Sequence, residues 1–470
     1  MPRKKRREST AAAWAPPIGR LPSGQALPRV ESTPSRPAVR APAAPSRRRS
    51  EARPTTLMGW LQAALRDYDQ PLLIVVGTLL MLGLIMVYSS SFSYAYALFE
   101  QSAYFFTRQL MWAGIGLMTL VFFMWVDYHL WQRLAVAILF GMLGLLILPL
   151  IVNAANFGAA QSLLRSGSVQ PSEAAKLGLV IYNAAWLASK GERLRELGTG
   201  LIPYAIILAG VDGLVIMEPD FGTAILLFII AAAMFFIAGA EIKQLAIGSL
   251  LSVSALAFFI SRSAHAMQRV RDFIATVKDP LHGGSYHVQQ LIRALAEGGF
   301  LGRGIGQSQI KGPGGVPLPW SDSIFAILGN ELGLLGSLFV LGLFLMLAYR
   351  GLRITLNAPD KDHFGGLLAF GITCWLVSQA FINIAVITAT APLTGMTLPF
   401  ISFGGSSLVT SLAGVGILLN ISRAGNRKDA DDAPAGLWRW NRGTRLSGSG
   451  RDPEPTPSAD WRAIPPRRSR

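Results

Sequence analysis

PLLIVVGTLLMLGLIMVYSS, the sequence of residues 71–90, runs for twenty residues without a charged side chain. An α-helix of this length spans about 30 Å, which is the thickness of the hydrocarbon core of a bilayer. A helix can cross that core because its backbone N–H and C=O groups pair within the segment. The stretch therefore predicts a membrane-spanning helix.

Nine further apolar stretches of similar length accompany it. The ten predicted spans are residues 71–90, 109–126, 134–152, 172–189, 201–217, 222–240, 243–261, 323–348, 366–390 and 402–422. The composition agrees, since 51% of the 470 residues are hydrophobic and only 15% are charged, against about 25% charged in an average soluble domain. We predict an all-α polytopic membrane protein with about ten transmembrane helices, which excludes a purely soluble, disordered or collagen-like chain.

The excess of positive charge lies at the two ends of the chain. Residues 1–70 hold 14 Lys and Arg against 5 Asp and Glu, and residues 423–470 hold 11 against 6. Both ends are rich in Pro and Arg and lack apolar periodicity, which is typical of disorder. We predict disordered basic tails over 1–66 and 423–470 and a membrane domain over 67–422. An even number of spans and the basic tails place both termini in the cytoplasm, with the domain in the cytoplasmic (inner) cell membrane. No nucleic-acid partner is expected, because the tails show no folded binding pattern.

A long segment, residues 262–322, separates the seventh and eighth predicted spans on the outer face. It carries seven Lys and Arg residues, and long loops cross the membrane regardless of charge. A basic outer loop favours an anionic partner such as lipid phosphate. Residues 286–299 have helix-like apolar spacing and residues 302–315 are glycine-rich, which predicts a membrane-hugging helix followed by a flexible loop.

Charged side chains within predicted spans are costly, so each suggests a function. Glu173 and Lys176 lie three residues apart on one helical face. They would form either a satisfied ion pair or a polar lining in which Lys176 faces a lipid phosphate. Glu331 follows Asp322 by nine residues, about 13 Å along the eighth span. It would make a buried contact between helices or line an internal cavity.

Asp322 directly precedes an apolar span in the stretch Trp320-Ser321-Asp322-Ser323. One interpretation is structural: Ser321 or Asp322 caps the helix, and capping lowers the pKa of the carboxyl and makes it a poor base. The other is catalytic, and it requires that the membrane and Trp320 desolvate the carboxylate.

Residues 398–407, LPFISFGGSS, open the tenth predicted span. Ser402, Ser406 and Ser407 could expose backbone N–H groups to an anion, or the small residues could simply permit close helix packing. The single cysteine, Cys374, and the five scattered histidines form no metal-ligand pattern, so no metal site is predicted.

Short motifs occur in a fixed order along residues 67–422, about three quarters of the chain. They are Tyr68-Asp69, residues 87–90, residues 170–173 with Lys176, residues 219–223, residues 279–280 with 284–286, Ser321-Asp322 with residues 324–326, residues 331–333, Gln379 with Asn383, and residues 398–407. In these motifs the chain resembles the SEDS family of cell-wall glycosyltransferases, which includes FtsW, RodA and SpoVE. Ten spans with a large outer loop between the seventh and eighth are also the plan of that family.

The resemblance implies polymerisation of lipid II into glycan strands on the outer face of the membrane, with release of undecaprenyl pyrophosphate. It makes Asp322 the catalytic residue, which would take the proton of an acceptor sugar hydroxyl as that oxygen attacks the anomeric carbon of the donor. Cations would stabilise the pyrophosphate leaving group, and a divalent ion such as Mg or Mn is one candidate. The candidate substrate-binding residues are Glu173, Lys176, Arg269, Arg271, Lys278, Ser402, Ser406 and Ser407.

The partners implied are lipid II, a class B penicillin-binding protein with transpeptidase activity, and other membrane proteins of the division or elongation machinery. The long tails favour division. Two alternatives remain: a flippase or transporter of lipid-linked precursors, suggested by the charges within the spans, and a weakly catalytic scaffold, suggested by departures from the family pattern. The departures are Leu318, Trp320 and Ser321 before Asp322, Ser323 after it, Asn330 before Glu331, and a missing Arg-Trp pair for which Arg165 could substitute.

Overall fold

The computed structural model describes residues 66–154, 170–279, 282–312, 314–359 and 362–432. Within these ranges the chain is helical and contains no strand. The ten long helices are α2 (Gln70–Phe99), α3 (Tyr104–Trp125), α4 (His129–Ala154), α6 (Pro171–Lys190), α7 (Ile202–Met217), α8 (Phe221–Ile237), α9 (Ile242–Arg262), α12 (Ile324–Leu356), α13 (His363–Ile387) and α14 (Gly405–Asp432). Most of both tails, and Arg165, lie outside the described residues.

Each predicted span coincides with one of these long helices. Eight described helices are long and apolar enough to cross a membrane, and α8 is a shorter apolar helix of 17 residues. The remaining helix, α6, has 20 residues and carries three charged side chains, Glu173, Lys176 and Lys190. The prediction of an all-α polytopic membrane protein is confirmed. Helix α14 continues ten residues beyond the predicted end of the membrane domain.

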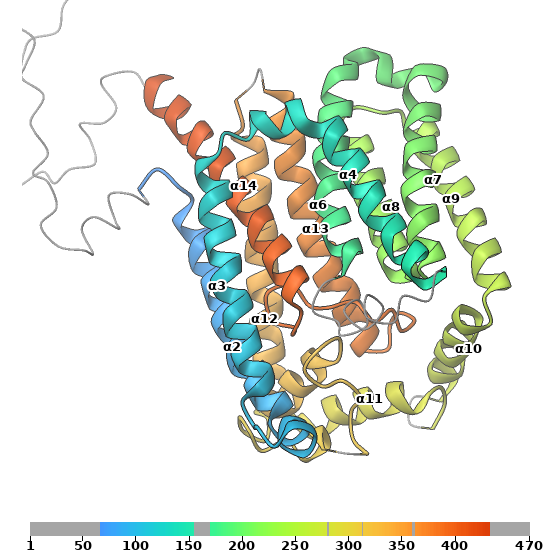
Figure 1. Cartoon of the computed structure of the whole chain (residues 1–470), viewed down its shortest axis with the longest axis vertical. Coiled ribbons are helices and arrows are strands. Elements are labelled where there is room, and N and C mark those ends of the chain that lie inside the picture. Colours follow the sequence, from blue (N-terminus) through green and yellow to red (C-terminus); the bar gives the residue numbers. More distant parts are fainter. Residues whose placement is uncertain (1–65, 155–169, 280–281, 313, 360–361, 433–470) are drawn as a thin grey trace, which may run out of the picture. The chain divides into compact units, whose positions relative to one another are not determined.

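The beginning of α2 and the end of α14 lie side by side (Figure 1). The side-chain amide of Asn426 donates to the backbone oxygen of Asp67 over 3.0 Å, and the backbone N–H of Asp69 donates to Ser422 Oγ over 3.3 Å. Arg350, near the end of α12, forms an ion pair with Asp69. We call this region the terminal end. Because the first and last long helices have their outer ends in this one region, the number of spans between them is even.

Helices α3 and α14 pack together through small residues. A Cβ atom at Gly116 would lie 2.5 Å from the side chain of Leu412, and one at Gly416 would lie 2.5 Å from the backbone oxygen of Leu120. Small residues let helix backbones approach closely, and dispersion contacts then stabilise the pair within a membrane.

The opposite end of the helices carries the long loop, residues 263–323, which begins with two amphipathic helices (Figure 1). Helix α10 (Ala264–Lys278) was not predicted from the sequence, whereas α11 (Tyr286–Gly298) confirms the helix expected over residues 286–299. Helix α11 packs against the start of α12, where the side-chain amide of Asn330 donates to the backbone oxygen of Ala294 over 2.8 Å.

Helix α12 is broken at Gly333, which has a φ of 69° and a ψ of −166°. The long loop pairs with the backbone groups that the break releases. The carbonyls of residues 330 and 331 accept the N–H groups of residues 303 and 304, and the N–H groups of residues 334 and 335 donate to the carbonyls of residues 299 and 300. The approach requires glycine, since a Cβ at Gly333 would lie 2.3 Å from the nitrogen of Gly302. Residues 299–304 are therefore packed against α12, so the flexible loop predicted over residues 302–315 is wrong for its first three residues.

Candidate functional site

Asp322 lies at the junction of the long loop and α12. The residue that precedes the helix is Ser323, which forms no side-chain capping bond with the described residues. Asp322 is half-buried, and its Oδ1 atom is buried without a hydrogen-bond partner among the described residues. Burial raises the pKa of Asp322 above its usual range, although the nearby His287 and Arg269 oppose that shift. The expectation of a capping carboxyl with a lowered pKa is therefore wrong.

A segment between α13 and α14, residues 388–404, fixes the backbone around Asp322. The side-chain amide of Asn383 donates to the backbone oxygen of Asp322 over 2.9 Å and to that of Met396 over 2.7 Å. Ser402 Oγ donates to the backbone oxygen of Ser321 over 2.8 Å. These bonds hold the backbone carbonyls of Ser321 and Asp322 in place.

Trp320 belongs to a buried aromatic cluster just before Asp322. It is buried, with its ring stacked on Phe105 at a centroid distance of 4.4 Å and edge-on to Tyr94 at 5.1 Å. Aromatic pairs of this kind stabilise a site and exclude water from it. Burial desolvates Asp322, as the catalytic interpretation requires, and Trp320 is itself buried two residues before it.

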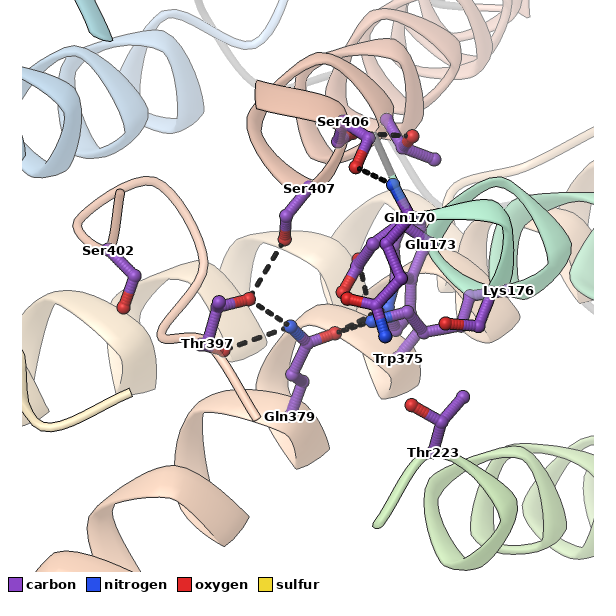
Figure 2. Close-up of polar contacts among 12 residues, drawn as sticks. Gln170, Glu173, Lys176, Thr223, Trp375, Gln379, Thr397, Ser402, Ser406 and Ser407 are labelled. Carbon is purple, nitrogen blue, oxygen red and sulfur yellow. Dashed lines mark hydrogen bonds and ion pairs between the residues drawn. The ribbon is translucent and has the colours of Figure 1, made fainter. Parts of the chain in front are cut away.

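A buried polar network joins α6, α13, residues 388–404 and α14 (Figure 2). Lys176 Nζ lies 2.7 Å from Glu173 Oε2 and donates to Gln379 Oε1 over 2.8 Å. Gln379 Nε2 donates to the backbone oxygen of Thr397 over 2.9 Å, and Thr397 Oγ1 lies 3.0 Å from Ser407 Oγ. Lys176 is only 1% exposed. Of the two alternatives for Glu173 and Lys176, the geometry supports the satisfied ion pair.

The three candidate serines join separate segments of the chain. Ser402 lies in a turn before α14, and its Oγ accepts the N–H of Leu398 over 2.8 Å. Ser406 Oγ accepts the N–H of Gln170 over 3.0 Å, and Ser407 bonds to Thr397. Helix α14 begins at Gly405, three residues later than predicted. The contacts support the packing role for these serines over the binding of an anion.

The three candidate cations of the long loop all lie on α10, but only one faces Asp322. Arg269 is half-buried and close enough to influence the charge of Asp322. Arg271 and Lys278 are exposed. At about 100° per residue, both lie on roughly the opposite side of the helix from Arg269.

Sequence reasoning missed two contacts that join the long loop to α12. Lys311 lies in the glycine-rich segment, yet its Nζ atom is 2.7 Å from Glu331 Oε1, and Ser89 Oγ on α2 donates to the same carboxylate over 2.7 Å. Glu331 thus joins α12 to α2 and to the long loop. His287, on α11, has its Nε2 atom 2.8 Å from Ser323 Oγ. The only signals in the sequence were the position of Lys311 among glycines and the position of His287 in the first turn of a predicted helix.

A divalent cation is one of the expectations that the resemblance raises for this site. The described residues contain no group of three or more His, Cys, Asp or Glu side chains placed to hold a metal. Mg and Mn prefer several oxygen ligands, whereas Asp322 has Arg269 and His287 as its charged or titratable neighbours.

Residues 70–427 match the family model of FtsW, RodA and SpoVE, described as a cell cycle protein. The chain is 37% identical over 361 residues to the probable peptidoglycan glycosyltransferase FtsW of Trichlorobacter lovleyi, which covers 76% of this chain and 94% of the relative. It is 38% identical over 357 residues to stage V sporulation protein E of Bacillus subtilis, which covers 75% and 96%.

Two solved structures share the fold. One is a chain of a peptidoglycan synthase complex, with a TM-score of 0.60, 24% identity, and coverage of 76% of this chain and 98% of that one. The other is the rod shape determining protein RodA of Thermus thermophilus, with a TM-score of 0.53, 24% identity, and coverage of 76% and 97%.

Proposed function

The chain belongs to the FtsW, RodA and SpoVE family, and we propose that it is a peptidoglycan glycosyltransferase that polymerises lipid II during cell division. The related protein of Trichlorobacter lovleyi carries the name of that activity. We place the terminal end in the cytoplasm and the long loop on the outer face. The charge distribution supports this placement, because Lys190, Arg193, Arg195 and Arg350 lie in short connections or at helix ends toward the terminal end.

The environment of Asp322 is the observation that carries the proposal. A half-buried carboxylate with one unpartnered oxygen and a raised pKa is suited to accept a proton. In the reaction, the acceptor hydroxyl oxygen forms a bond to the anomeric carbon of the donor. The bond from that carbon to the lipid pyrophosphate breaks, and its electron pair leaves with the pyrophosphate. The proton of the hydroxyl passes to Asp322.

Arg269 is the candidate cation for the leaving group. It lies on the face of α10 toward Asp322, and its guanidinium can hold a phosphate through two parallel hydrogen bonds. Stabilisation of charge that develops in the transition state is commonly the largest contribution to catalysis. Lys176 does not fit this role in the present structure, because Glu173 and Gln379 already occupy its ammonium group.

The proposed partners are a class B penicillin-binding protein and other membrane proteins of the division machinery. Their support is the fold shared with a chain of a peptidoglycan synthase complex. Exposed apolar side chains on α9, such as Ile242, Leu250 and Leu251, fit contact with lipid or with a partner helix equally well.

The test is an assay of the purified chain with lipid II and a class B penicillin-binding protein. We expect glycan strands on a gel, and we expect none when Asp322→Asn replaces the wild type. Transport of a labelled lipid II across vesicles without polymer would favour the flippase alternative. If the chain bound the penicillin-binding protein but neither polymerised nor transported lipid II, the result would favour the scaffold.

A further inference from the structure

We propose that His287 is a positioning residue for Asp322, because it anchors the start of α12 through Ser323. This inference rests on the proposed function of Asp322 as the base. His287 is the second residue of α11, and its Nε2 atom lies 2.8 Å from Ser323 Oγ. Ser323 is 1% exposed and directly follows Asp322. The contact therefore ties α11 to α12 at the residue next to the base.

The hydroxyl of Ser323 has no second duty among the described residues. A serine before a helix commonly caps it, but Ser323 forms no capping bond. The Ser323 hydroxyl instead forms a hydrogen bond with the imidazole of His287. A bond between α11 and α12 thus stands in place of a capping bond within α12. A shift of about 1 Å in the placement of a reacting group can cost a large factor in rate, and a bond at this point restrains such a shift.

The charged groups that face His287 are Asp322 and, from α10, Arg269. Burial lowers the pKa of His287, the negative charge of Asp322 raises it, and Arg269 lowers it. The influence is mutual, because His287 lowers the pKa of Asp322. Each group thus favours the charged form of the other.

Two substitutions separate the effect of the His287–Ser323 hydrogen bond from the effect of the imidazole on the pKa of Asp322. His287→Gln keeps a hydrogen-bonding group but cannot titrate, and Ser323→Ala removes the bond but keeps the imidazole. For His287→Gln we expect kcat to fall about tenfold, and we expect the acid limb of the pH profile to move to higher pH, because an influence that lowers the pKa of Asp322 is lost. For Ser323→Ala we expect the fall in kcat without the move. The control is His282→Gln, since that side chain lies on the same loop and is 82% exposed.

A titration of the histidine signals by NMR tests the pairing without activity. The pKa of His287 should fall in Asp322→Asn, because the carboxylate that raises it is gone. A His287→Gln enzyme with wild-type kcat and pH profile, or an unchanged His287 titration in Asp322→Asn, would overturn the inference while the proposed function stood. If the wild type makes no glycan, the proposed function fails, and the titration still decides whether the two residues are paired.

A second inference concerns the terminal end, which lies at the opposite end of α12 from Asp322. A cavity of about 360 Å³ opens there between the beginning of α2 and the ends of α12 and α14. Three of its lining side chains are guanidinium groups, Arg66, Arg350 and Arg353, whereas Asp69 is its one carboxylate. Asp69 is paired with Arg350, and Arg353 adds a further positive charge to the lining.

We infer that this cavity binds the phosphate of an anionic phospholipid headgroup. The cavity lies where the apolar helices α2 and α12 end, which is the level of lipid headgroups. Basic pockets between transmembrane helices on the cytoplasmic side commonly bind such groups, and arginine matches the geometry of phosphate. The side-chain amides of Asn357 and Asn426 also line the cavity and can donate to phosphate oxygens.

Native mass spectrometry of the protein from vesicles of phosphatidylglycerol and phosphatidylcholine tests this site. We expect the wild type to retain phosphatidylglycerol, and the double variant Arg66→Gln, Arg353→Gln to retain about tenfold less. Arg195→Gln, an exposed arginine toward the same end but outside the cavity, should behave as wild type. Equal retention by the double variant would overturn the inference. Displacement of the lipid by millimolar inorganic phosphate would overturn the lipid source and identify free phosphate as the ligand.

Discussion

The ammonium group of Lys311 lies 2.7 Å from the carboxylate of Glu331, and both side chains are at most 7% exposed. Lys311 belongs to the long loop, and Glu331 lies two residues before the break in α12. Ser89 on α2 donates to the same carboxylate. One buried cluster thus connects α2, the long loop and α12. Each member of a buried ion pair needs the other, because an unpaired charge in the interior is costly.

Removal of one member of this pair should therefore destabilise the protein. We expect Lys311→Met to lower the free energy of unfolding by about 3–5 kcal/mol, seen as a lower midpoint in thermal unfolding. The double variant Lys311→Met, Glu331→Leu should recover most of the loss, since no buried charge remains. The control is Arg293→Met, which breaks an exposed ion pair with Glu297 and should cost less than about 1 kcal/mol. A Lys311→Met protein as stable as this control would show that the pair does not hold the loop.

The break in α12 gives a second prediction. Gly333→Ala places a Cβ 2.3 Å from the nitrogen of Gly302 at a φ of 69°, so the long loop must move away from α12. We expect faster proteolysis of the long loop and lower polymerisation. Gly342→Ala lies in the same helix with nothing within 4 Å, and it should be neutral or stabilising by up to about 1 kcal/mol. Equal protease resistance of the two variants would contradict the packed loop.

The connection between α7 and α8 predicts a dependence of stability on pH. Burial, and then the charge of Asp220, raise the pKa of Glu218 from 4.5 to about 7. The folded protein therefore holds a proton on Glu218 that the unfolded chain releases at lower pH. The stabilisation is complete below about pH 4.5 and is lost as the pH rises through about 7.

We therefore expect the unfolding midpoint to fall between about pH 5 and pH 8, and Glu218→Gln to reduce that fall. The control is Glu192→Gln, an exposed carboxylate in the connection after α6. A wild-type midpoint with no dependence on pH in this interval would argue against the burial of Glu218.

Reporter fusions test the placement of the two ends. Fusions after residue 30 and residue 450 should report the cytoplasm, and one after residue 300, in the long loop, should report the outer face. The terminal end supports this, since Asp67 and Asn426 are bonded to each other. A cytoplasmic signal from residue 300, or an outer signal from either end, would exclude the proposed topology.

The sequence predicted the helices well because each apolar stretch is a local signal, complete within about twenty residues. It predicted α11 from the apolar spacing of residues 286–299. The break at Gly333 was not predictable, because the predicted span 323–348 runs through it without interruption, and the break depends on backbone bonds with the distant residues 299–304. The pairing of Lys311 with Glu331 and of His287 with Ser323 likewise depends on contacts between segments 20 and 36 residues apart. Asp322 was identified by resemblance, whereas its raised pKa follows from burial that no local pattern contains.

Asp322→Asn is the decisive substitution for the proposed mechanism. The amide keeps the size of the side chain but cannot accept the proton, so polymerisation should fall by at least about 100-fold. The fold should persist, because Asn383 and Ser402 bind the backbone carbonyls of Asp322 and Ser321, and an amide keeps an oxygen that can accept the local backbone N–H groups. Thermal unfolding and binding to the penicillin-binding protein should match wild type. Asp322→Ala should have the same effects, since the carboxylate does not cap α12.

The control is Glu297→Gln, which changes a carboxylate of the same loop that is paired with two arginines. This variant should keep most of the activity. If Asp322→Asn polymerised lipid II as fast as this control, the base would have to be sought elsewhere.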